Sequence, residues 1–337
     1  MSTDLPWLSI LLPVYKVEAY LADCAESILA QADTGVELIF VDDASPDGSA
    51  QILADLQGKH PQQLRCIRHT HNQGLSAARN TALSAAQGQY VWFVDSDDLL
   101  EPGAIASLKA TVDRHAPDLI LCDFRAFDDE NNPQRLSQPR YAHIATFKGP
   151  KRVLSQDRSA LLGGLFEAGQ LHSWSKIFKR SAWPAGLVFP VGRTFEDLAV
   201  SPYLALQARN YIHVPEVWLA YRQRAGSILA NLSPAKIEDW MLAMVGFGAA
   251  LNAADLPHSD QTRFEVAHFC ARTFIRACKR RVKLVGQSQD PDALARYAQH
   301  WQNSSPMSAS ALMRAYLRRG RWLRALQFHY WTRRAAR

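Results

Sequence analysis

The sequence predicts an α/β fold followed by a mainly helical C-terminal region. Two observations carry this prediction. In the first third of the 337 residues, short continuous apolar runs alternate with longer amphipathic segments. Beyond about Ser233, apolar residues recur at helical spacing to the end of the chain. Strands buried on both faces of a parallel sheet give continuous apolar runs, and the helices that cover them give amphipathic segments.

The apolar runs predict five strands, at 8–12, 36–41, 64–68, 90–94 and 119–122. The segments between them carry apolar residues on one helical face, as Leu21 and Ile28 do in the first. They predict helices at 18–30, 48–56, 75–86 and 104–115. Short strands that are joined by helices run parallel, so we expect a parallel sheet covered on both faces.

The remainder of the chain is less regular at first. A stretch rich in Pro, Asn and Gln predicts a long loop at 128–150, and 155–202 mixes short helices and strands. Helical spacing then predicts helices at 236–251, 262–285, 291–302 and 308–331. We place the domain boundaries so that 1–130 and 131–230 form two halves of one α/β domain and 231–337 forms a helical, basic region.

The net charge of +6 conceals a division between the two ends. Residues 1–130 contain 8 basic and 20 acidic residues, whereas 131–337 contain 30 and 12. The acidic end can hold a cation, and the basic end should seek an anion. No helix-turn-helix, zinc-finger or RNA-binding signature accompanies the charge, so we expect no nucleic-acid partner. An anionic membrane surface or an anionic acceptor fits the charge at least as well as nucleic acid does.

Cysteine usage and hydropathy suggest a location. The five cysteines are scattered and form no Cys-x-x-Cys pair, which predicts reduced thiols. No secretory signal is recognisable, and no apolar run reaches the roughly 20 residues of a membrane span. We expect a cytoplasmic protein, with a peripheral position on the inner face of the cytoplasmic membrane as the further expectation.

Carboxylates follow two of the predicted strands. Parallel strands bring their carboxyl ends to one edge of the sheet, where ligands of such folds bind. So many carboxylates repel one another unless a cation joins them, and an oxygen-only cluster suits Mg²⁺ or Mn²⁺. No glycine-rich phosphate loop follows the first strand, so the metal would hold a diphosphate. The carboxylates are Asp42 and Asp43 after the second strand, and Asp95, Asp97 and Asp98 after the fourth.

Four sequence blocks resemble the family 2 glycosyltransferases, in that family's order and spacing. They are LSILLPVY from Leu8, FVDDASPDGS from Phe40, NQGLSAARN from Asn72 and FVDSDD from Phe93. The resemblance implies a GT-A fold, with 1–130 as the nucleotide-sugar-binding half and 131–230 as the acceptor-binding half. It also implies an inverting hexosyl- or N-acetylhexosaminyl-transferase that takes a sugar from a nucleotide-diphosphate donor, UDP-linked by preference. The acceptor would be a hydroxyl of a capsule, exopolysaccharide or lipopolysaccharide, either a free glycan or one linked to lipid.

The resemblance further implies a role for each matching residue. Pro13 and Tyr15 would line the nucleobase pocket, and Asp42 or, by preference, Asp43 would contact the uracil or ribose. Without the resemblance, the two aspartates could be only a polar turn that opens a helix. Tyr15 could likewise be an ordinary half-buried aromatic residue.

The later blocks would supply the diphosphate and metal ligands. Arg79 would lie near the base or diphosphate, Asp95 would face the ribose and metal, and Asp97 would ligate the metal. The aspartates could instead form a capped loop, and Arg79 could be a solvated helix residue.

Three positions depart from the family pattern. Lys16 stands where Asn is common, and Ala44 and Ala82 stand where Gly is common. None of these departures removes a reactive group, but Lys16 bears on which donor is bound.

The second half offers the remaining candidates. Inverting transfer needs a base for the acceptor hydroxyl, and the family's Glu-Asp pair matches Glu196 and Asp197. Asp197 is the candidate base, and Glu196 would orient it or hold the acceptor. Thr194 with Asp197 also resembles a helix capping box. Lys176 could neutralise the leaving diphosphate or bind an anionic acceptor, or it could be a solvated lysine.

The C-terminal segment from Ser310 carries eight arginines and no acid. Its apolar residues predict a helix that lies on an anionic membrane, or one that packs on the domain or in a dimer. The residues of the predicted face are Trp322, Leu323, Leu326 and Tyr330, beside Arg321, Arg324, Arg333 and Arg334.

Two other functions compete with glycosyl transfer. A sugar-phosphate nucleotidyltransferase is also an α/β enzyme with metal-binding aspartates, but it would need a glycine- and arginine-rich loop after the first strand. A non-catalytic glycan- or membrane-binding protein on the same scaffold would be favoured by loss of a metal-binding aspartate. Asp95, Asp97 and Asp197 are all present.

Overall fold

The computed structural model describes residues 5–128, 139–223, 232–256, 259–285 and 292–336. The chain divides into two compact units. The first comprises Met1–Gln156, Gln170–Gly192 and Gln207–Ala225, and the second comprises Asp157–Gly169, Arg193–Leu206 and Gly226–Arg337. The domain boundaries that the sequence predicts, at 130/131 and 230/231, lie outside the described residues and remain predictions.

The first unit contains an eight-stranded sheet in the order β3-β2-β1-β4-β7-β6-β8-β5. All five predicted strands are present. The strands are β1 (Leu8–Val14), β2 (Val36–Asp42), β3 (Leu64–Arg68), β4 (Tyr90–Phe93), β5 (Leu99–Leu100), β6 (Leu119–Asp128), β7 (Lys176–Lys179) and β8 (Tyr211–Gln223). The first four predicted strands pair in parallel, and their apolar side chains are buried except for Cys66 and Ile67 in β3, which are partly buried.

The prediction of an all-parallel sheet is wrong beyond β4. The short strand β7 lies between β4 and β6 and is antiparallel to each. β5 is likewise antiparallel to β8. Strands from distant parts of the chain create these pairings, so the local apolar pattern could not reveal them. The sequence also predicts no element at β8, where Pro215 and Glu216 interrupt the apolar pattern and form a bulge against β6.

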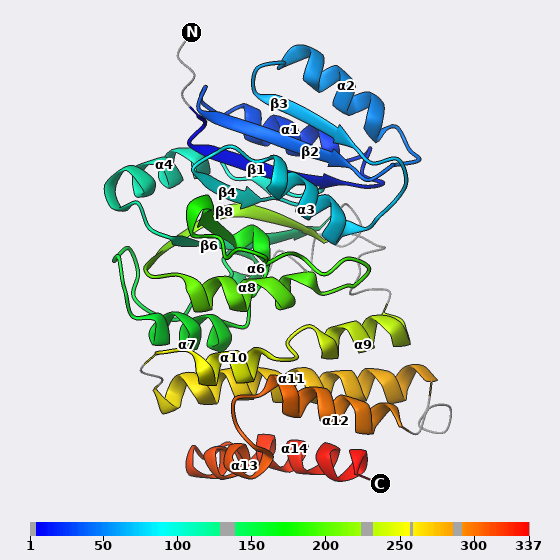
Figure 1. The fold of residues 1–337 in the computed structure, drawn as a ribbon, viewed down its shortest axis with the longest axis vertical. Coiled ribbons are helices and arrows are strands. Elements are labelled where there is room, and N and C mark those ends of the chain that lie inside the picture. Colours follow the sequence, from blue (N-terminus) through cyan, green and yellow to red (C-terminus); the bar gives the residue numbers. More distant parts are fainter. Residues whose placement is uncertain (1–4, 129–138, 224–231, 257–258, 286–291, 337) are drawn as a thin grey trace. The chain divides into compact units, whose positions relative to one another are not determined.

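Four helices of the first unit follow the prediction closely: α1 (Leu21–Leu29), α2 (Ser49–Lys59), α3 (Leu75–Ala85) and α4 (Ala104–His115). The chain moves outward from β1 through β2 to β3, then crosses back to β4. Right-handed crossovers therefore place α3 on the opposite face of the sheet from α1 and α2, as Figure 1 shows. This arrangement leaves the carboxyl ends of β1, β2 and β4 at one edge.

The described part of the loop predicted at 128–150 contains some secondary structure. It contains the short helix α6 (Pro139–Ala142), and Ile144 forms an isolated bridge with Phe124 of β6. Residues 129–138 of this prediction lie outside the described residues. Three further short elements complete this part of the chain: the 3₁₀ helices η1 (Ser173–Ser175) and η2 (Arg180–Ala182), and helix α7 (Arg158–Ala168) of the second unit.

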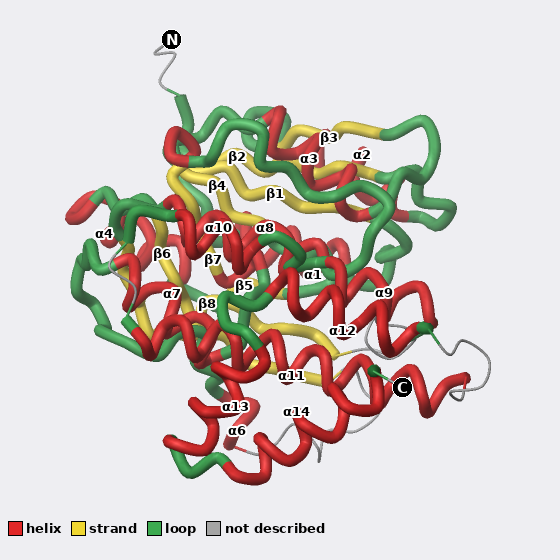
Figure 2. The backbone as a smooth tube through the Cα atoms, turned by 60° about the horizontal axis from the view of Figure 1, so that its bottom comes forward, coloured by secondary structure: helices red, strands yellow, loops and turns green. Residues whose placement is uncertain are grey.

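The second unit is helical, as predicted (Figure 2, red). Two of its predicted helices are each split in two. Gly246, at φ 92°, separates α9 from α10, and Gly320, at φ 67°, separates α13 from α14. Glycine adopts positive φ at little cost, so Gly246 can precede the start of α10 and Gly320 can follow the end of α13 inside an unbroken apolar pattern. The helices are α8 (Glu196–Gln207), α9 (Pro234–Leu242), α10 (Phe247–Ala253), α11 (Asp260–Val285), α12 (Ala293–Ser304), α13 (Ala309–Arg318) and α14 (Trp322–Ala335). Pro291, the predicted start of α12, lies outside the described residues.

Helix α14 is amphipathic in an unusual way, because it has two apolar faces. Ala325, Phe328 and Trp331 are buried within the unit. The four apolar residues that the sequence singled out, Trp322, Leu323, Leu326 and Tyr330, are 60%, 76%, 66% and 53% exposed. Packing on the unit therefore uses a different face from the one that was predicted to meet a membrane. Among the described residues, no helix is sufficiently long and apolar to span a membrane.

Candidate active site

The loops after β1, β2 and β4 are joined by hydrogen bonds. The Ser96 hydroxyl donates to the Pro13 carbonyl at 2.7 Å, and the Asp43 amide donates to the Val14 carbonyl at 2.9 Å. Val14 is also aligned with Asp42 in the parallel register of β1 and β2. The structure thus brings together Pro13, Asp42, Asp43 and the Asp95–Asp98 turn, as the parallel arrangement predicts.

Asp43 is buried, and its carboxylate organises the loop that precedes α3. Its Oδ1 accepts from the Gln73 amide at 2.9 Å, and its Oδ2 accepts from the Gly74 amide at 2.7 Å. His69 Nδ1 lies 2.7 Å from Oδ1, and His69 Nε2 lies 2.9 Å from the Thr81 hydroxyl. His69 thus links Asp43 to α3.

Asp42 and Tyr15 occupy different environments. Asp42 is buried and accepts from the Ser45 amide at 2.8 Å, with Arg68 Nε 3.2 Å from its other oxygen. Tyr15 is 40% exposed, so its ring is available to a ligand. The Lys16 ammonium lies 5.3 Å from the centroid of that ring. Pro13, by contrast, is buried in β1.

Two of the three departures from the family pattern lie at residues with positive φ. Lys16 has φ 55° and Ala44 has φ 56°, so each residue occupies the left-handed region. This region is comfortable for Gly and tolerable for Asn, the residues that are common there in the family. Ala82 differs, because it lies inside α3 and is fully buried.

Arg79 is deeply buried at this edge of the sheet. Its side chain is 1% exposed, and its Nη2 donates to Asp95 Oδ1 at 2.8 Å. The guanidinium also lies 5.4 Å from the Phe189 ring centroid and 6.0 Å from that of Phe93. The alternative of a solvated helix residue is therefore wrong. Arg79 instead holds Asp95, whose carboxylate remains 27% exposed.

Asn80, the next residue, fixes the loop that carries Phe189. Its side-chain amide donates to the Phe189 carbonyl at 2.8 Å and accepts from the Phe189 amide at 2.9 Å, across 109 residues of sequence. Sequence reasoning included Asn80 in a motif without giving it a role. Its place at the end of that motif was the available signal.

The turn after β4 carries three carboxyl groups with different environments. Asp97 is partly exposed, whereas Asp98 is fully buried. Asp98 Oδ1 accepts from the Arg222 amide at 2.8 Å, and Asp98 Oδ2 is buried without a hydrogen-bond partner in the described part of the chain. Burial raises the pKa of Asp98 well above its usual range, and the charges of Asp97 and Asp95 raise it further.

This turn fits a divalent cation that is shared with a substrate. No group of three or more His, Cys, Asp and Glu side chains in the described ranges is arranged to hold a metal by itself. Mg²⁺ in phosphate-binding enzymes needs only one or two protein carboxylates, because phosphate oxygens and water complete its shell. Asp95 and Asp97, which are partly exposed and belong to the same turn, meet that need.

Lys176 is buried in β7. Its ammonium donates to the carbonyls of Gln170 and His172, at 3.0 and 2.7 Å, and to the Ser175 hydroxyl at 3.0 Å. The alternative of a solvated lysine is wrong. The predicted contact with a diphosphate or an acceptor remains a prediction, and it would require one of these hydrogen bonds to be exchanged.

Glu196 and Asp197 open α8 and belong to the second unit. Glu196 is buried, and Asp197 is partly exposed. Phe195, just before them, has φ 60° and stacks on Trp240 at 5.3 Å. The amide and hydroxyl of Thr194 both donate to Asp239 Oδ2, at 2.9 and 3.1 Å. Thr194 therefore bonds to α9, and it lies two residues before the helix start rather than at the N-cap position that a capping box requires.

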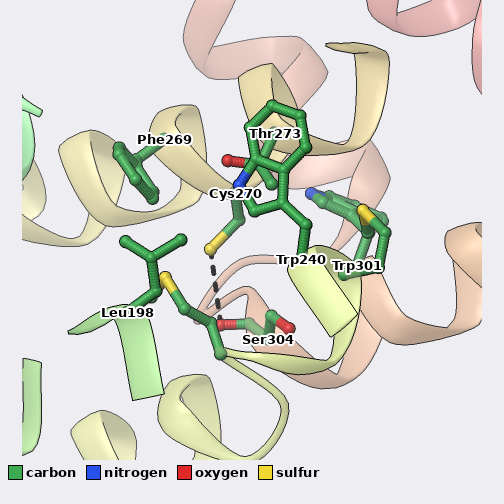
Figure 3. Close-up of a pocket in the computed structure, with 9 residues that line it drawn as sticks. Leu198, Trp240, Phe269, Cys270, Thr273, Trp301 and Ser304 are labelled. Atoms are coloured by element: carbon green, nitrogen blue, oxygen red, sulfur yellow. Dashed lines mark hydrogen bonds between the residues drawn. The ribbon is translucent and has the colours of Figure 1, made fainter. Parts of the chain in front are cut away.

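A small apolar pocket lies within the second unit, close to the start of α8 (Figure 3). Leu198 lines it together with Trp240, Met241 and Phe269. The Cys270 thiol, which also lines the pocket, donates to the Ser304 carbonyl at 3.6 Å. The residues that line this pocket include no cationic side chain of the kind that a diphosphate requires. The pocket is therefore not a candidate donor site.

The first unit has the sheet of a GT-A domain, with these aspartates at one edge. Residues 9–166 match the family model described as Glycosyl transferase family 2. The chain is also 30% identical over 244 residues to Glycosyltransferase GlyA of Streptococcus pneumoniae, covering 71% of this chain and 33% of that protein. Residues 9–166 therefore belong to a family 2 glycosyltransferase domain, and the resemblance that the sequence blocks indicated is confirmed.

Two further comparisons concern a longer relative and a solved structure. The minor teichoic acid biosynthesis protein GgaB of Bacillus subtilis is 35% identical over 240 residues, covering 69% of this chain and 25% of that protein. The chain thus spans a third or less of these two relatives. The crystal structure of S. aureus TarS 1-349 in complex with UDP-GlcNAc has a TM-score of 0.73 and 22% identity, covering 97% and 88% of the two chains. This likeness establishes the fold.

Proposed function

We propose that the protein is an inverting glycosyltransferase that transfers a hexosyl or N-acetylhexosaminyl group from a UDP-sugar to a hydroxyl group. The observation that carries the proposal is the pair of partly exposed carboxylates, Asp95 and Asp97, at the carboxyl end of β4. Family membership and the UDP-GlcNAc bound to a protein of the same fold support a nucleotide-sugar donor.

The donor site would be built from the first unit. Tyr15, exposed at the end of β1, would contact the base, and the Asp42/Asp43 loop would contact the uracil or ribose. Arg79 holds Asp95 in place by its hydrogen bond and lends positive charge close to the diphosphate. Mg²⁺ or Mn²⁺ held by Asp97 and Asp95 would supply charge neutralisation for the departing diphosphate.

The second half of the reaction needs a proton acceptor. We assign this role to Asp197, which would take the proton of the acceptor hydroxyl as its oxygen attacks the anomeric carbon. Glu196 would orient Asp197 or hold the acceptor. The strained backbone of Phe195, directly before this pair, supports a functional position, because such strain persists where the surrounding structure enforces it.

The acceptor would be a cell-surface glycan, free or linked to lipid, as the teichoic acid relative supports. A lipid-linked acceptor lies at a membrane, and the exposed face of α14 offers a means of reaching it. Trp322, Leu323 and Leu326 would enter the interface, with Arg333 and Arg334 toward the phosphates of anionic lipids. We therefore place the protein in the cytoplasm, at the inner face of the cytoplasmic membrane.

Calorimetric titration with UDP tests the donor site. Wild-type protein should bind UDP in the presence of Mn²⁺, and EDTA should abolish the binding. A parallel screen of nucleotide sugars, with released UDP or GDP as the signal, identifies the donor. Binding of UDP that EDTA leaves unchanged would refute the metal-bridged site.

A further inference from the structure

Arg222, close to the end of β8, contacts the turn that carries the metal-binding aspartates. Its Nε donates to the Asp97 carbonyl at 2.7 Å, and its amide donates to Asp98 Oδ1 at 2.8 Å. The two segments are 124 and 125 residues apart in the sequence. Arg222 therefore joins the aspartate turn after β4 to a strand from the other half of the sheet.

Aromatic rings hold the guanidinium from two further directions. Its central carbon lies 4.8 Å from the ring centroid of Tyr20, which precedes α1, and 4.6 Å from that of Phe127 in β6. Stacked contacts of this kind restrict the orientation of a guanidinium as well as contributing energy. The Nε donor is thus aimed at the Asp97 carbonyl by packing that does not involve the turn itself.

The charge of Arg222 acts on the same turn. Asp95, Asp97 and Asp98 concentrate carboxyl groups within four residues, and mutual repulsion would spread them if nothing opposed it. A cation beside the backbone of the turn thus helps to keep the carboxylates together before a metal binds.

We propose that Arg222 is a positioning residue for the divalent cation, because it fixes the backbone of the turn that presents Asp97. This inference rests on the proposed function, since it takes Asp97 as a metal ligand. Arg222 acts through Asp97 and Asp98. The hydrogen bond from its backbone amide to Asp98 Oδ1 does not depend on the side chain, so it is kept in any variant. Substitution by glutamine removes the Nε bond, the ring contacts and the charge.

The test measures Mn²⁺ affinity rather than sugar transfer. Free Mn²⁺ is followed by electron paramagnetic resonance in the presence of UDP, for wild type, Arg222→Gln and Arg222→Lys. Loss of a residue that orients metal ligands commonly weakens affinity about 10–100-fold, and we expect this range for Arg222→Gln. Arg222→Lys keeps a cation that can lie against the rings but lacks the planar Nε donor, so we expect a loss of about 3–10-fold.

Arg209 supplies a control in the first unit, to which Arg222 also belongs. It makes two hydrogen bonds to Asp118 with Nε and Nη2, and it does not contact the aspartate turn. Arg209→Gln should therefore leave Mn²⁺ affinity unchanged, whatever it does to thermal stability. If Arg222→Gln fails to fold, the Mn²⁺ affinity of Arg222→Lys tests the proposal instead.

The outcomes separate this inference from the proposed function. Wild type that binds Mn²⁺, together with folded Arg222 variants whose affinity is within about 2-fold of it, would overturn the role of Arg222 alone. Equal losses in Arg222→Gln and Arg209→Gln would also overturn it, because they would indicate general destabilisation. Wild type that binds no Mn²⁺ with UDP would refute the metal site itself, and the inference with it.

Discussion

The guanidinium of Arg79 donates to Asp95 Oδ1 at 2.8 Å from a side chain that is only 1% exposed. A buried arginine is costly unless it is paired, and Asp95 provides a partner while remaining partly open to solvent. The pair connects the helix after β3 to the turn after β4. Stability and donor binding should therefore respond together when Arg79 is changed.

Arg79→Met should destabilise the protein by about 2 kcal/mol. Breaking a fully buried pair costs about 3–5 kcal/mol, and the partial exposure of Asp95 reduces that figure. Urea unfolding measures the effect. Metal-dependent UDP affinity should fall in the same variant, because Asp95 loses the group that orients it. A variant with wild-type stability and UDP affinity would show that the pair has neither role.

Ala44→Gly should stabilise the protein by about 0.5 kcal/mol, because glycine relieves the left-handed conformation at φ 56°. Ala82→Gly is the matched control, since the family favours glycine at both positions. Ala82 lies inside α3, so this substitution should cost about 1 kcal/mol through lost helix propensity. Thermal unfolding of the two variants compares them directly. Shifts of the same sign would argue against backbone strain at Ala44.

Asp197→Asn should slow sugar transfer by about 10²–10⁴-fold, which is the usual contribution of a positioned base. UDP affinity should stay at the wild-type value, because the proposed donor site belongs to the first unit. Steady-state kinetics and calorimetry on the same preparation separate these quantities. Near wild-type transfer, or loss of folding, would leave Asp197 with a structural role at the start of α8.

The lowered pKa of Asp123 leads us to expect that the free energy of unfolding depends on pH. Burial opposes its ionisation, but hydrogen bonds from His213, Thr146 and His143 hold its pKa below the usual value. A carboxyl group with a lowered pKa stabilises the fold above its unfolded pKa, near 3.9, and loses that contribution as pH falls through the folded value. Asp123→Asn should therefore be clearly less stable than wild type at pH 7, and the gap should narrow toward pH 3. A gap that is constant with pH would contradict the prediction.

Leu323→Glu with Leu326→Glu should abolish binding to vesicles that contain phosphatidylglycerol. Both side chains are largely exposed, so the substitutions spare the packed face of α14. Truncation is a poorer test, because it removes the buried Phe328 and Trp331. Val153→Glu, at another exposed apolar residue in the first unit, is the control and should bind like wild type. Flotation at low salt measures binding, and wild type that fails to float would refute the membrane proposal.

The sequence by itself determined the first half of the fold and the location of the aspartates. Local rules suffice there, because buried strands and amphipathic helices have distinct apolar periods. The ends of parallel strands then follow from topology. The four predicted helices of the first unit agree with the structure to within a few residues, and the order of the motifs identified the family.

Only the tertiary structure decided which polar side chains support the candidate site. Arg79, Asn80 and Arg222 obtain their roles from partners in other parts of the chain, and neither local spacing nor composition records such contacts. The same reason explains the insertion of β7 into the sheet, because strand pairing between distant segments depends on how the whole chain packs. The breaks at Gly246 and Gly320 depend likewise on backbone angles that packing selects, within an apolar pattern that runs on unbroken.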